Sequence, residues 1–267
     1  MLYITSDIHG KFNSLDIMLK HIKFSKNDKL IINGDLMDRG EDLKPLIDFI
    51  LLNKNNVEVI LGNHEYMFIK ACENGLLDDI DIFEIRTKHF FTGETIKVLT
   101  AYDNVIDLWF SNGGDITFRN TSIKDLKRLY NYLKDKPYYK FIDDNLIIHA
   151  GPHTYYSYGW SKDKFVKWIE QQELKDILWD RGFFEKQFLT NEEIEYPVNI
   201  FIGHNSLYNQ NIEPFKIMKN GNLLVNTDQS NNLNKDMNNL GMFCLDTMTY
   251  LKLIGNVITE VDIKKYK

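Results

Sequence analysis

The amino-acid sequence predicts an α/β fold built around a largely parallel sheet. Three short apolar runs in the first 65 residues, at positions 2–5, 30–32 and 57–61, each end in a polar turn that contains glycine and lead into a helical pattern. Strands that alternate with helices are typical of βαβ units. Ligands of such sheets bind beyond the carboxyl ends of the strands, which is where the three turns lie.

Two helices are expected between these strands. The first covers residues 12–22, because Leu15, Met18, Leu19 and Ile22 recur at the spacing of one helix face. The second covers residues 43–52. Its Pro45 falls in the first turn, where a missing N–H removes no helical hydrogen bond.

The middle of the chain changes character. Residues 66–140 are charged and follow a helical pattern without a clear strand, which predicts a helical cap inserted over the site. Strand patterns return at positions 146–148, 198–202 and 223–225, and a hairpin is expected over 242–254 with its turn near 246–249. We therefore expect a single domain over residues 1–267 with the cap at about 66–140, and an Asn-rich loop over 228–241.

Composition narrows the classes of partner. A net charge of −6 gives no basic footprint, so nucleic acid is not expected as a partner. Long apolar stretches and a signal-peptide pattern are absent from the sequence, so we expect neither a membrane span nor export. Cys72 and Cys244 match no metal or redox spacing and are expected as buried thiols, which fits a cytoplasmic protein.

Polar side chains follow five of the predicted strands. The turns are Asp7-Ile8-His9-Gly10, Gly34-Asp35-Leu36-Met37-Asp38-Arg39-Gly40, Gly62-Asn63-His64-Glu65, His149-Ala150-Gly151 and Gly203-His204-Asn205. Taken singly, each has a simpler interpretation: an Asp at a strand end can cap the next helix, and a lone His can be a core residue. Together, at successive strand ends, they predict a metal centre.

The types of side chain limit the choice of metal. Asp7 and His9 share one face of an extended segment, because strand side chains alternate with period two. Carboxylate, imidazole and amide oxygen suit Mn, Fe or Zn rather than a thiolate site or an all-oxygen calcium site. Availability decides among these three metals.

These turns resemble the phosphoprotein phosphatase family within the calcineurin-like metallophosphoesterases, and the short bacterial and phage serine/threonine phosphatases in particular. The family pattern Gly-Asp-x-His-Gly, Gly-Asp-x-x-Asp-Arg-Gly, Gly-Asn-His-Glu, His-Ala-Gly and Gly-His is present with Ser6 in place of the first Gly. Asn112-Gly113-Gly114 and Leu178-Trp179-Asp180-Arg181 also resemble segments of the bacterial members. The resemblance implies an α-β-β-α sandwich in which two sheets pack face to face between helices.

The resemblance also implies a ligand set. Two divalent metal ions would be held by Asp7 and His9 (first metal), Asp35 (bridging), and Asn63, His149 and His204 (second metal). Mn is the first expectation, with Fe and Zn as alternatives. A hydroxide that bridges the metals would attack phosphorus directly, without a phosphoenzyme.

The remaining roles concern the leaving group and the phosphate. In the family pattern His64 is the proton donor to the leaving alkoxide, and Asp38 orients it. Arg39 and Arg181 would grip the phosphate oxygens, which suits a planar guanidinium. The simpler interpretations are a solvated charge pair at a helix entry for Asp38 and Arg39, and a surface side chain for Arg181.

The resemblance implies a phosphatase of phosphoserine and phosphothreonine in proteins, with phosphotyrosine as a further substrate. The alternative is a bis(5'-nucleosyl)-tetraphosphatase, which hydrolyses diadenosine tetraphosphate with the same fold. Bacterial members of that group tend to carry Ala at the position of Asp38 and Asp at that of Glu65, so both positions favour the phosphatase. A non-catalytic binding module should have lost ligands, and a nuclease fits the acidic composition poorly.

Two departures from the pattern concern the substrate. Leu61 stands where the family often carries Arg, and Asn226-Thr227-Asp228 replaces Asp-Thr-Gly. The second segment borders the substrate groove in relatives. Substrate specificity is therefore the property that these departures affect most.

Overall fold

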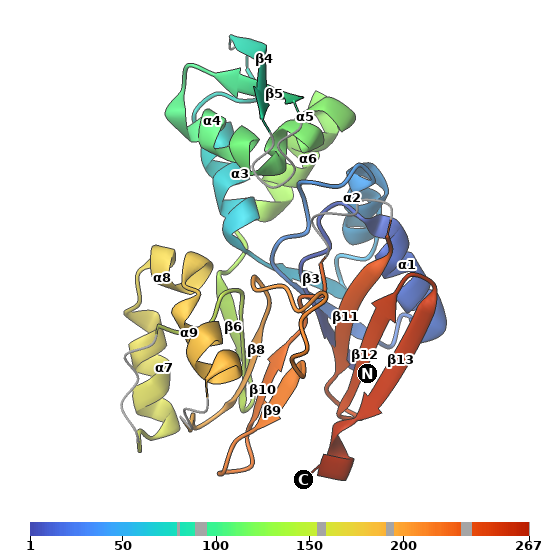
Figure 1. Ribbon diagram of the computed structural model, residues 1–267, viewed down its shortest axis with the longest axis vertical. Helices are drawn as coiled ribbons and strands as arrows, with labels where there is room; N and C mark the ends of the chain where they lie inside the picture. Colours follow the sequence, from blue (N-terminus) through green and yellow to red (C-terminus); the bar gives the residue numbers. More distant parts are fainter. Residues whose placement is uncertain (79–80, 89–94, 154–158, 191–194, 231–236, 267) are drawn as a thin grey trace.

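The computed structural model describes residues 1–266 except 79–80, 89–94, 154–158, 191–194 and 231–236 (Figure 1). The first sheet contains β1 (Leu2–Thr5), β2 (Lys29–Asn33), β3 (Val57–Ile60), β11 (Asn239–Cys244), β12 (Thr249–Ile254) and β13 (Val257–Asp262) in the order β13-β12-β11-β1-β2-β3. β1, β2 and β3 are parallel, and β11 runs antiparallel to β1. The parallel sheet that the sequence predicts for the first 65 residues is confirmed.

Helices α1 (Phe12–His21) and α2 (Leu43–Leu52) cover the outer face of this sheet. They occupy the ranges expected from the sequence to within one residue. Their apolar faces, with Leu15 and Met18 from α1 and Leu46 and Ile50 from α2, are fully buried in the core on that side. Burial of these stripes holds both helices against the strands that precede the polar turns.

The second sheet contains β6 (Tyr139–Ile142), β7 (Asn145–Ile148), β8 (Asn199–Ile202), β9 (Phe215–Ile217) and β10 (Leu223–Asn226) in the order β6-β7-β8-β10-β9. β7, β8 and β10 are parallel. Helices α7 (Lys162–Glu170), α8 (Leu174–Trp179) and α9 (Gly182–Phe184) lie on its outer face, at the left in Figure 1. The three strands predicted at 146–148, 198–202 and 223–225 are the central strands of this sheet.

The two sheets pack against each other through alternate residues of their strands. Ile31 of β2 and Ile147 of β7 lie in one shared core between the sheets. Their chain neighbours Leu30 and Ile148 face the helices on either side instead. Apolar residues at every position are expected of strands that are buried on both faces. The result is the α-β-β-α sandwich that the resemblance implies.

The segment between β3 and β6 differs from the expected wholly helical cap over 66–140. Helix α3 begins at Asn63 and ends at Glu73, and α4 (Asn104–Trp109), η1 (Phe110–Gly114), α5 (Asp115–Asn120) and α6 (Ile123–Leu133) follow. Between α3 and α4 lies an antiparallel hairpin of β4 (Ile82–Lys88) and β5 (Thr95–Ala101). The expectation of no strand here is wrong. We call residues 82–133 the cap segment; it stands at the top of Figure 1.

Solvent exposure explains why the sequence pattern does not predict the β4–β5 hairpin and some edge strands. The described side chains of β4 and β5 are half-buried or exposed, so neither strand has a buried apolar face that would alternate with a polar one. β6, β9 and β13 are edge strands that the sequence does not predict. Cys72 and Cys244 are free thiols, as expected, but only Cys244 is buried and Cys72 is half-buried. Among the described residues, no helix is long and apolar enough to cross a bilayer.

Candidate metal centre

The five polar turns meet at one end of the two sheets. The backbone N–H of Asp7 donates to Gly34 O at 3.0 Å, which joins the turns after β1 and β2. The N–H of Gly203 donates to His149 O at 2.8 Å and joins the turns after β7 and β8. Across the sheets, Asn33 Nδ2 donates to the carbonyls at the ends of β7 and β8, at 3.1 and 3.2 Å. Asn33, at the end of β2, therefore links the two sheets by hydrogen bonds close to the site.

Two glycines are required by the close approach of these turns. A Cβ on Gly62 would collide with the Asp35 carboxylate, and a Cβ on Gly203 would collide with that of Asp7. Both glycines precede candidate ligands, Asn63 and His204. Their lack of a side chain lets turns from different strands bring their polar groups together.

Backbone strain is concentrated at this site. Ten non-glycine residues in the described part of the chain have positive φ, and six of them belong to the candidate site: Asp7, His9, Asp35, Asp38, Arg39 and His204. The left-handed region is unfavourable for residues with side chains and persists only where the surroundings enforce it. Such residues cluster at active sites, which supports the assignment of these turns to function.

One group of candidate ligands is formed by Asp35, Asn63, His149 and His204. His149 Nε2 lies 3.2 Å from Asp35 Oδ1 and 3.1 Å from Asn63 Oδ1. Its Nδ1 faces the carbonyl of Asn33 at 2.9 Å, so Nδ1 must donate the proton. The Nε2 lone pair of a neutral His149 then points at two further acceptors. A divalent cation among these atoms would satisfy them all.

His204 also has a ring nitrogen that lacks a hydrogen-bond partner. Its Nδ1 lies 3.2 Å from Asn63 Oδ1, again an acceptor, and its buried Nε2 has no hydrogen-bond partner. His149 shows the electrostatic side: burial lowers its pKa, but Asp35, Asp7 and the carbonyl of Asn33 together outweigh burial and raise the pKa to about 10. A metal ion would take the place of that proton, since imidazole binds metals in its neutral form. These residues therefore fit a divalent metal.

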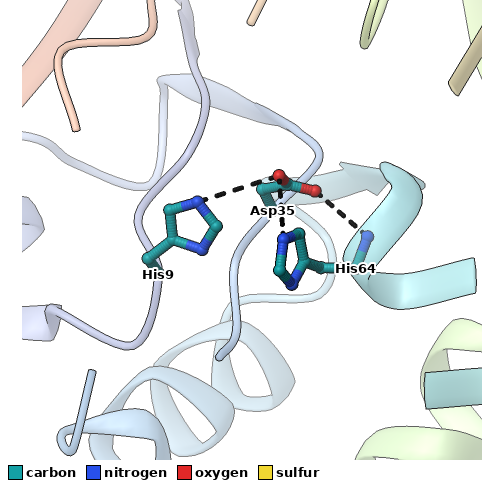
Figure 2. A group of neighbouring side chains, drawn as sticks. All are labelled: His9, Asp35 and His64. Atoms are coloured by element: carbon teal, nitrogen blue, oxygen red, sulfur yellow. Dashed lines mark hydrogen bonds and ion pairs between the residues drawn. The ribbon is translucent and has the colours of Figure 1, made fainter. Parts of the chain in front are cut away.

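A second group lies on the other side of Asp35 (Figure 2). Asp35 Oδ2 is 3.8 Å from His9 Nε2 and 3.8 Å from His64 Nε2. His9 Nδ1 faces the carbonyl of Met37 at 2.9 Å, so its Nε2 is the lone-pair atom that points toward Asp35. Asp7 follows β1 and contacts the first group, since both of its carboxylate oxygens accept from the backbone N–H of His204, at 3.1 and 3.2 Å. His9, Asp35 and His64 present ligand atoms within 4.8 Å of one another and could hold a second metal ion. The assignment of Asp7 to that ion stays a prediction.

Three carboxyl groups are buried at the site. Asp7, Asp35 and Asp228 are each at most 3% exposed. Burial raises the pKa of Asp7 well above its usual value, and the charge of nearby Asp228 adds to this. Burial also opposes ionisation of Asp35, but His149, His64 and His9 together outweigh it and hold the pKa of Asp35 well below its usual value. Buried carboxylates need cationic partners, which divalent ions would supply.

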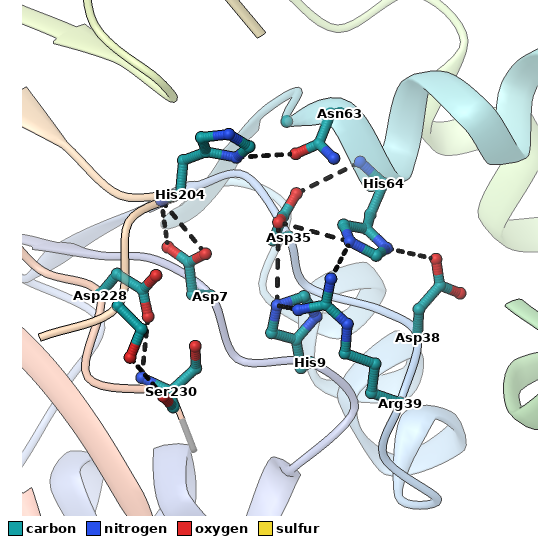
Figure 3. Close-up of polar contacts among 12 residues, drawn as sticks. Asp7, His9, Asp35, Asp38, Arg39, Asn63, His64, His204, Asp228 and Ser230 are labelled. Carbon is teal, nitrogen blue, oxygen red and sulfur yellow. Dashed lines mark hydrogen bonds and ion pairs between the residues drawn. The ribbon is translucent and has the colours of Figure 1, made fainter. Parts of the chain in front are cut away.

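His64 and Asp38 form a separate pair at the edge of this cluster (Figure 3). His64 Nδ1 lies 2.7 Å from Asp38 Oδ2, and both side chains are at most 1% exposed. The carboxylate can only accept, so the proton is on Nδ1, and Nε2 is directed toward Asp35 and Arg39. The geometry is that of an imidazole oriented by a carboxylate, as in general acid–base catalysis.

The two arginines lie at different parts of the site. Arg39 donates from Nη1 to His9 Nε2 and from Nη2 to His64 Nε2, both at 2.9 Å. Arg181 donates from Nη1 to Asn205 Oδ1 at 2.9 Å, and Asn205 directly follows His204. All ten predicted site residues thus belong to one connected arrangement, and eight of them, without His149 and Arg181, are labelled in Figure 3. Their roles stay predictions.

Several residues at the site do not follow from the sequence patterns. Glu65 accepts from the backbone N–H groups of Gly62, Asp35 and Leu36, each at 2.8 Å, and so binds two turns together. Ser6, the departure from the family's Gly, accepts from Thr227 Oγ1 at 2.8 Å. Ser6 and the unusual segment Asn226-Thr227-Asp228 are therefore neighbours in space. In that segment Asp228 replaces the family's Gly and places a carboxyl group near Asp7.

Comparisons with known proteins agree with this geometry. Residues 2–225 match the family described as calcineurin-like phosphoesterase. A symmetrical bis(5'-nucleosyl)-tetraphosphatase from Neisseria gonorrhoeae is 33% identical over 101 residues, which is 37% of either chain. The same enzyme from Buchnera aphidicola is 37% identical over 78 residues, 29% of this chain and 28% of the relative. The chain thus matches between 28% and 37% of the length of these curated relatives.

Solved structures share the fold across nearly the whole chain. A putative diadenosine tetraphosphatase has a TM-score of 0.52 at 15% identity and covers 97% of this chain and 92% of its own. A cold-active protein-tyrosine phosphatase of a Shewanella species has a TM-score of 0.52 at 17% identity, covering 97% of this chain and 79% of its own. At such identities the likeness concerns the fold alone. With the family match over residues 2–225, it leads to one conclusion: the chain belongs to the calcineurin-like phosphoesterase family.

Proposed function

We propose that this protein is a dinuclear-metal phosphomonoesterase that removes phosphate from phosphoserine and phosphothreonine in proteins. The family makes it a phosphoric ester hydrolase that uses divalent metal ions. We assign the first ion to Asp7 and His9, the second to Asn63, His149 and His204, and the bridging position to Asp35. Mn is our first choice of metal. When bound, two such ions supply Lewis acidity to the phosphate and lower the pKa of water.

The observation that carries the proposal is the buried hydrogen bond of 2.7 Å between His64 Nδ1 and Asp38 Oδ2. Serine and threonine leave as alkoxides, which are strong bases, so P–O cleavage is slow unless a proton reaches the leaving oxygen. His64 would give that proton from Nε2, and Asp38 would hold the ring and stabilise its charged form. When a dinucleoside tetraphosphate is cleaved, the leaving group is a nucleotide whose terminal phosphate has a second pKa of about 6. This leaving group is a weak base and needs no general acid.

The arginines would bind the ester. In our proposal Arg39 and Arg181 donate to the non-bridging oxygens of the phosphate. Arg39 Nη1 now donates to His9 Nε2, the atom that would bind metal, so Arg39 must turn away from His9 when a metal ion binds there. That movement would free its guanidinium for the phosphate.

The second candidate is symmetrical hydrolysis of dinucleoside tetraphosphates, which the names of the curated relatives favour. Their similarity covers at most 37% of this chain. The proposed preference for phosphomonoesters rests on Asp38, and the two activities can be separated directly.

A side-by-side assay separates them. Metal-stripped protein is reconstituted with Mn²⁺, and kcat/KM is measured on a phosphoserine peptide, a phosphotyrosine peptide and diadenosine tetraphosphate. We expect kcat/KM to be higher on the phosphoserine peptide than on diadenosine tetraphosphate. A higher kcat/KM on diadenosine tetraphosphate would reject our proposal in favour of the second candidate.

A further inference from the structure

The cap segment reaches the site at the two-residue turn of Asp38 and Arg39. Both residues have positive φ, 71° and 67°, a conformation that is unfavourable for side chains of their size. Two such residues in succession need outside support to stay in place. The contacts of this turn therefore show what holds the acid pair and one phosphate-binding arginine in position.

Helices α4 and α5 of the cap segment bind the carboxylate of Asp38. Trp109 Nε1 donates to Asp38 Oδ2 at 3.0 Å, the same oxygen that faces His64 Nδ1. Thr117 Oγ1 donates to Asp38 Oδ1 at 2.8 Å and accepts from the backbone N–H of Asp38 at 3.0 Å. Trp109, Thr117 and Asp38 are all fully buried. Each oxygen of the carboxylate is thus held by a side chain of the cap segment.

Arg39 is held by the turn between these helices. Its backbone N–H donates to Gly113 O at 3.2 Å. Gly113 has φ +99°, and a Cβ there would lie 2.8 Å from Arg39 Cγ. A Cβ on Gly114 would collide with the Trp109 ring. The Asn112-Gly113-Gly114 segment, which the proposed function leaves without a role, is shaped to accept Arg39 and Trp109.

We infer that Trp109, Gly113 and Thr117 are positioning residues, through which the cap segment orients the His64–Asp38 acid and Arg39 together. The inference rests on the proposed function. Asp38 can orient His64 only if its own carboxylate is fixed, and two donors from the cap segment fix it. The cap segment then helps to position the groups that protonate the leaving group.

The test compares three threonine variants of the metal-loaded enzyme. Thr117→Val removes the hydroxyl at nearly constant shape, whereas Thr117→Ser retains it. Thr121→Val is the matched control, because Thr121 is also a buried threonine of the cap segment and its Oγ1 has no hydrogen-bond partner. Substrates are a phosphoserine peptide, which needs the acid, and 4-nitrophenyl phosphate, whose leaving group is stable without a proton.

We expect Thr117→Val to lower kcat on the peptide by roughly 10- to 100-fold, part of the 10²- to 10⁴-fold contribution of a general acid, and kcat on 4-nitrophenyl phosphate by less than about threefold. Thr117→Ser should recover most of the loss, and Thr121→Val should match the wild type on both substrates. An equal loss on both substrates, or none on the peptide, would overturn the inference. A wild-type enzyme inactive on both esters would reject the proposed function instead.

A second variant tests the same geometry without turnover. Trp109→Phe keeps an aromatic ring in the core but removes the N–H that binds Asp38. In Zn²⁺-loaded protein, the His64 Nδ1 proton should give a downfield ¹H resonance, because it is hydrogen-bonded to a carboxylate. We expect this resonance to shift or broaden in Trp109→Phe and in Thr117→Val and to stay unchanged in Thr121→Val. An unchanged resonance in both of the first two variants would contradict the inference even if no substrate is turned over.

Discussion

Asp35 lies between the two groups of candidate ligands. One of its carboxylate oxygens faces His149 at 3.2 Å, and the other faces His9 and His64 at 3.8 Å. Asp35 has φ 54° and is 2% exposed, so the surrounding turns hold it in an unfavourable backbone conformation away from solvent. A bridging carboxylate in this place would couple the two metal ions.

Asp35→Asn tests this assignment. Asparagine keeps the shape and the acceptor for the backbone N–H of His64 but removes the charge and one ligand oxygen. We expect bound Mn, measured by inductively coupled plasma mass spectrometry, to fall below two ions per chain. Activity should fall by on the order of 100-fold or more, since a metal ion contributes several kcal/mol to the transition state. Full metal content with unchanged activity would contradict the bridging role.

At this scale the sequence is enough to propose the candidate site residues, whose roles stay predictions, but not to identify the residues that support them. Asp7, His9 and His64 lie in short local patterns at strand ends, which can be read without the fold. Asn33 and Trp109 act through partners 115 and 71 residues away. No local pattern records such distant contacts, so only the structure identifies these residues.

Glu65 links two elements of secondary structure. It lies in the first turn of α3, and its carboxylate accepts from the N–H that begins the helix and from two N–H groups of the turn after β2. The side chain is fully buried. Three charge-assisted hydrogen bonds therefore fix the position of α3, which carries Asn63 and His64, relative to Asp35.

Glu65→Gln should weaken this link. The amide can present an acceptor on one side only, so at least one buried N–H loses its partner, at a cost of about 2 kcal/mol. We expect Tm to fall by roughly 4–8 °C in thermal unfolding followed by circular dichroism. Glu58→Gln is the control: Glu58 pairs with Lys140 at the surface, and such a pair contributes less than about 1 kcal/mol. Equal shifts in the two variants would show that Glu65 has no special role.

Sequence periodicity predicts buried elements better than exposed ones. α2 is predicted residue for residue, because Leu46, Ile47 and Ile50 form an apolar stripe that packs on the sheet. The β4–β5 hairpin is missed, because it lies outside the two large sheets and none of the side chains described in its strands is fully buried. Its pairing is set by contacts between the two strands, and the sequence shows only a charged segment there.

At the scale of the whole molecule, the protein buries three carboxyl groups at the junction of its two sheets. Asp7, Asp35 and Asp228 are buried together where the carboxyl ends of both sets of parallel strands converge. Their mutual repulsion opposes folding. Bound cations would remove this cost, so metal binding and stability should be linked.

Metal removal should therefore lower the thermal stability of the whole protein. At 100 times the dissociation constant, one bound ion stabilises by about 2.7 kcal/mol, which corresponds to roughly 5–10 °C in Tm for a chain of this size. We expect differential scanning fluorimetry to show a Tm that is higher in Mn²⁺ than in EDTA by at least this amount.

The Asp35→Asn variant serves as its control. Its Tm should respond much less to Mn²⁺ than that of the wild type, because the bridging ligand is gone. A wild-type Tm that is the same in Mn²⁺ and in EDTA would mean that the carboxylates at the junction of the sheets hold no metal.

The leaving-group dependence of His64→Asn is the sharpest test of the proposed division of roles. Metal binding and leaving-group protonation are assigned to different residues, so loss of His64 should affect only substrates that need a proton. We predict that kcat/KM falls by about 10²- to 10⁴-fold on a phosphoserine peptide, and by less than about tenfold on 2,4-dinitrophenyl phosphate. An equal fall on both substrates, or no fall on the peptide, would contradict it.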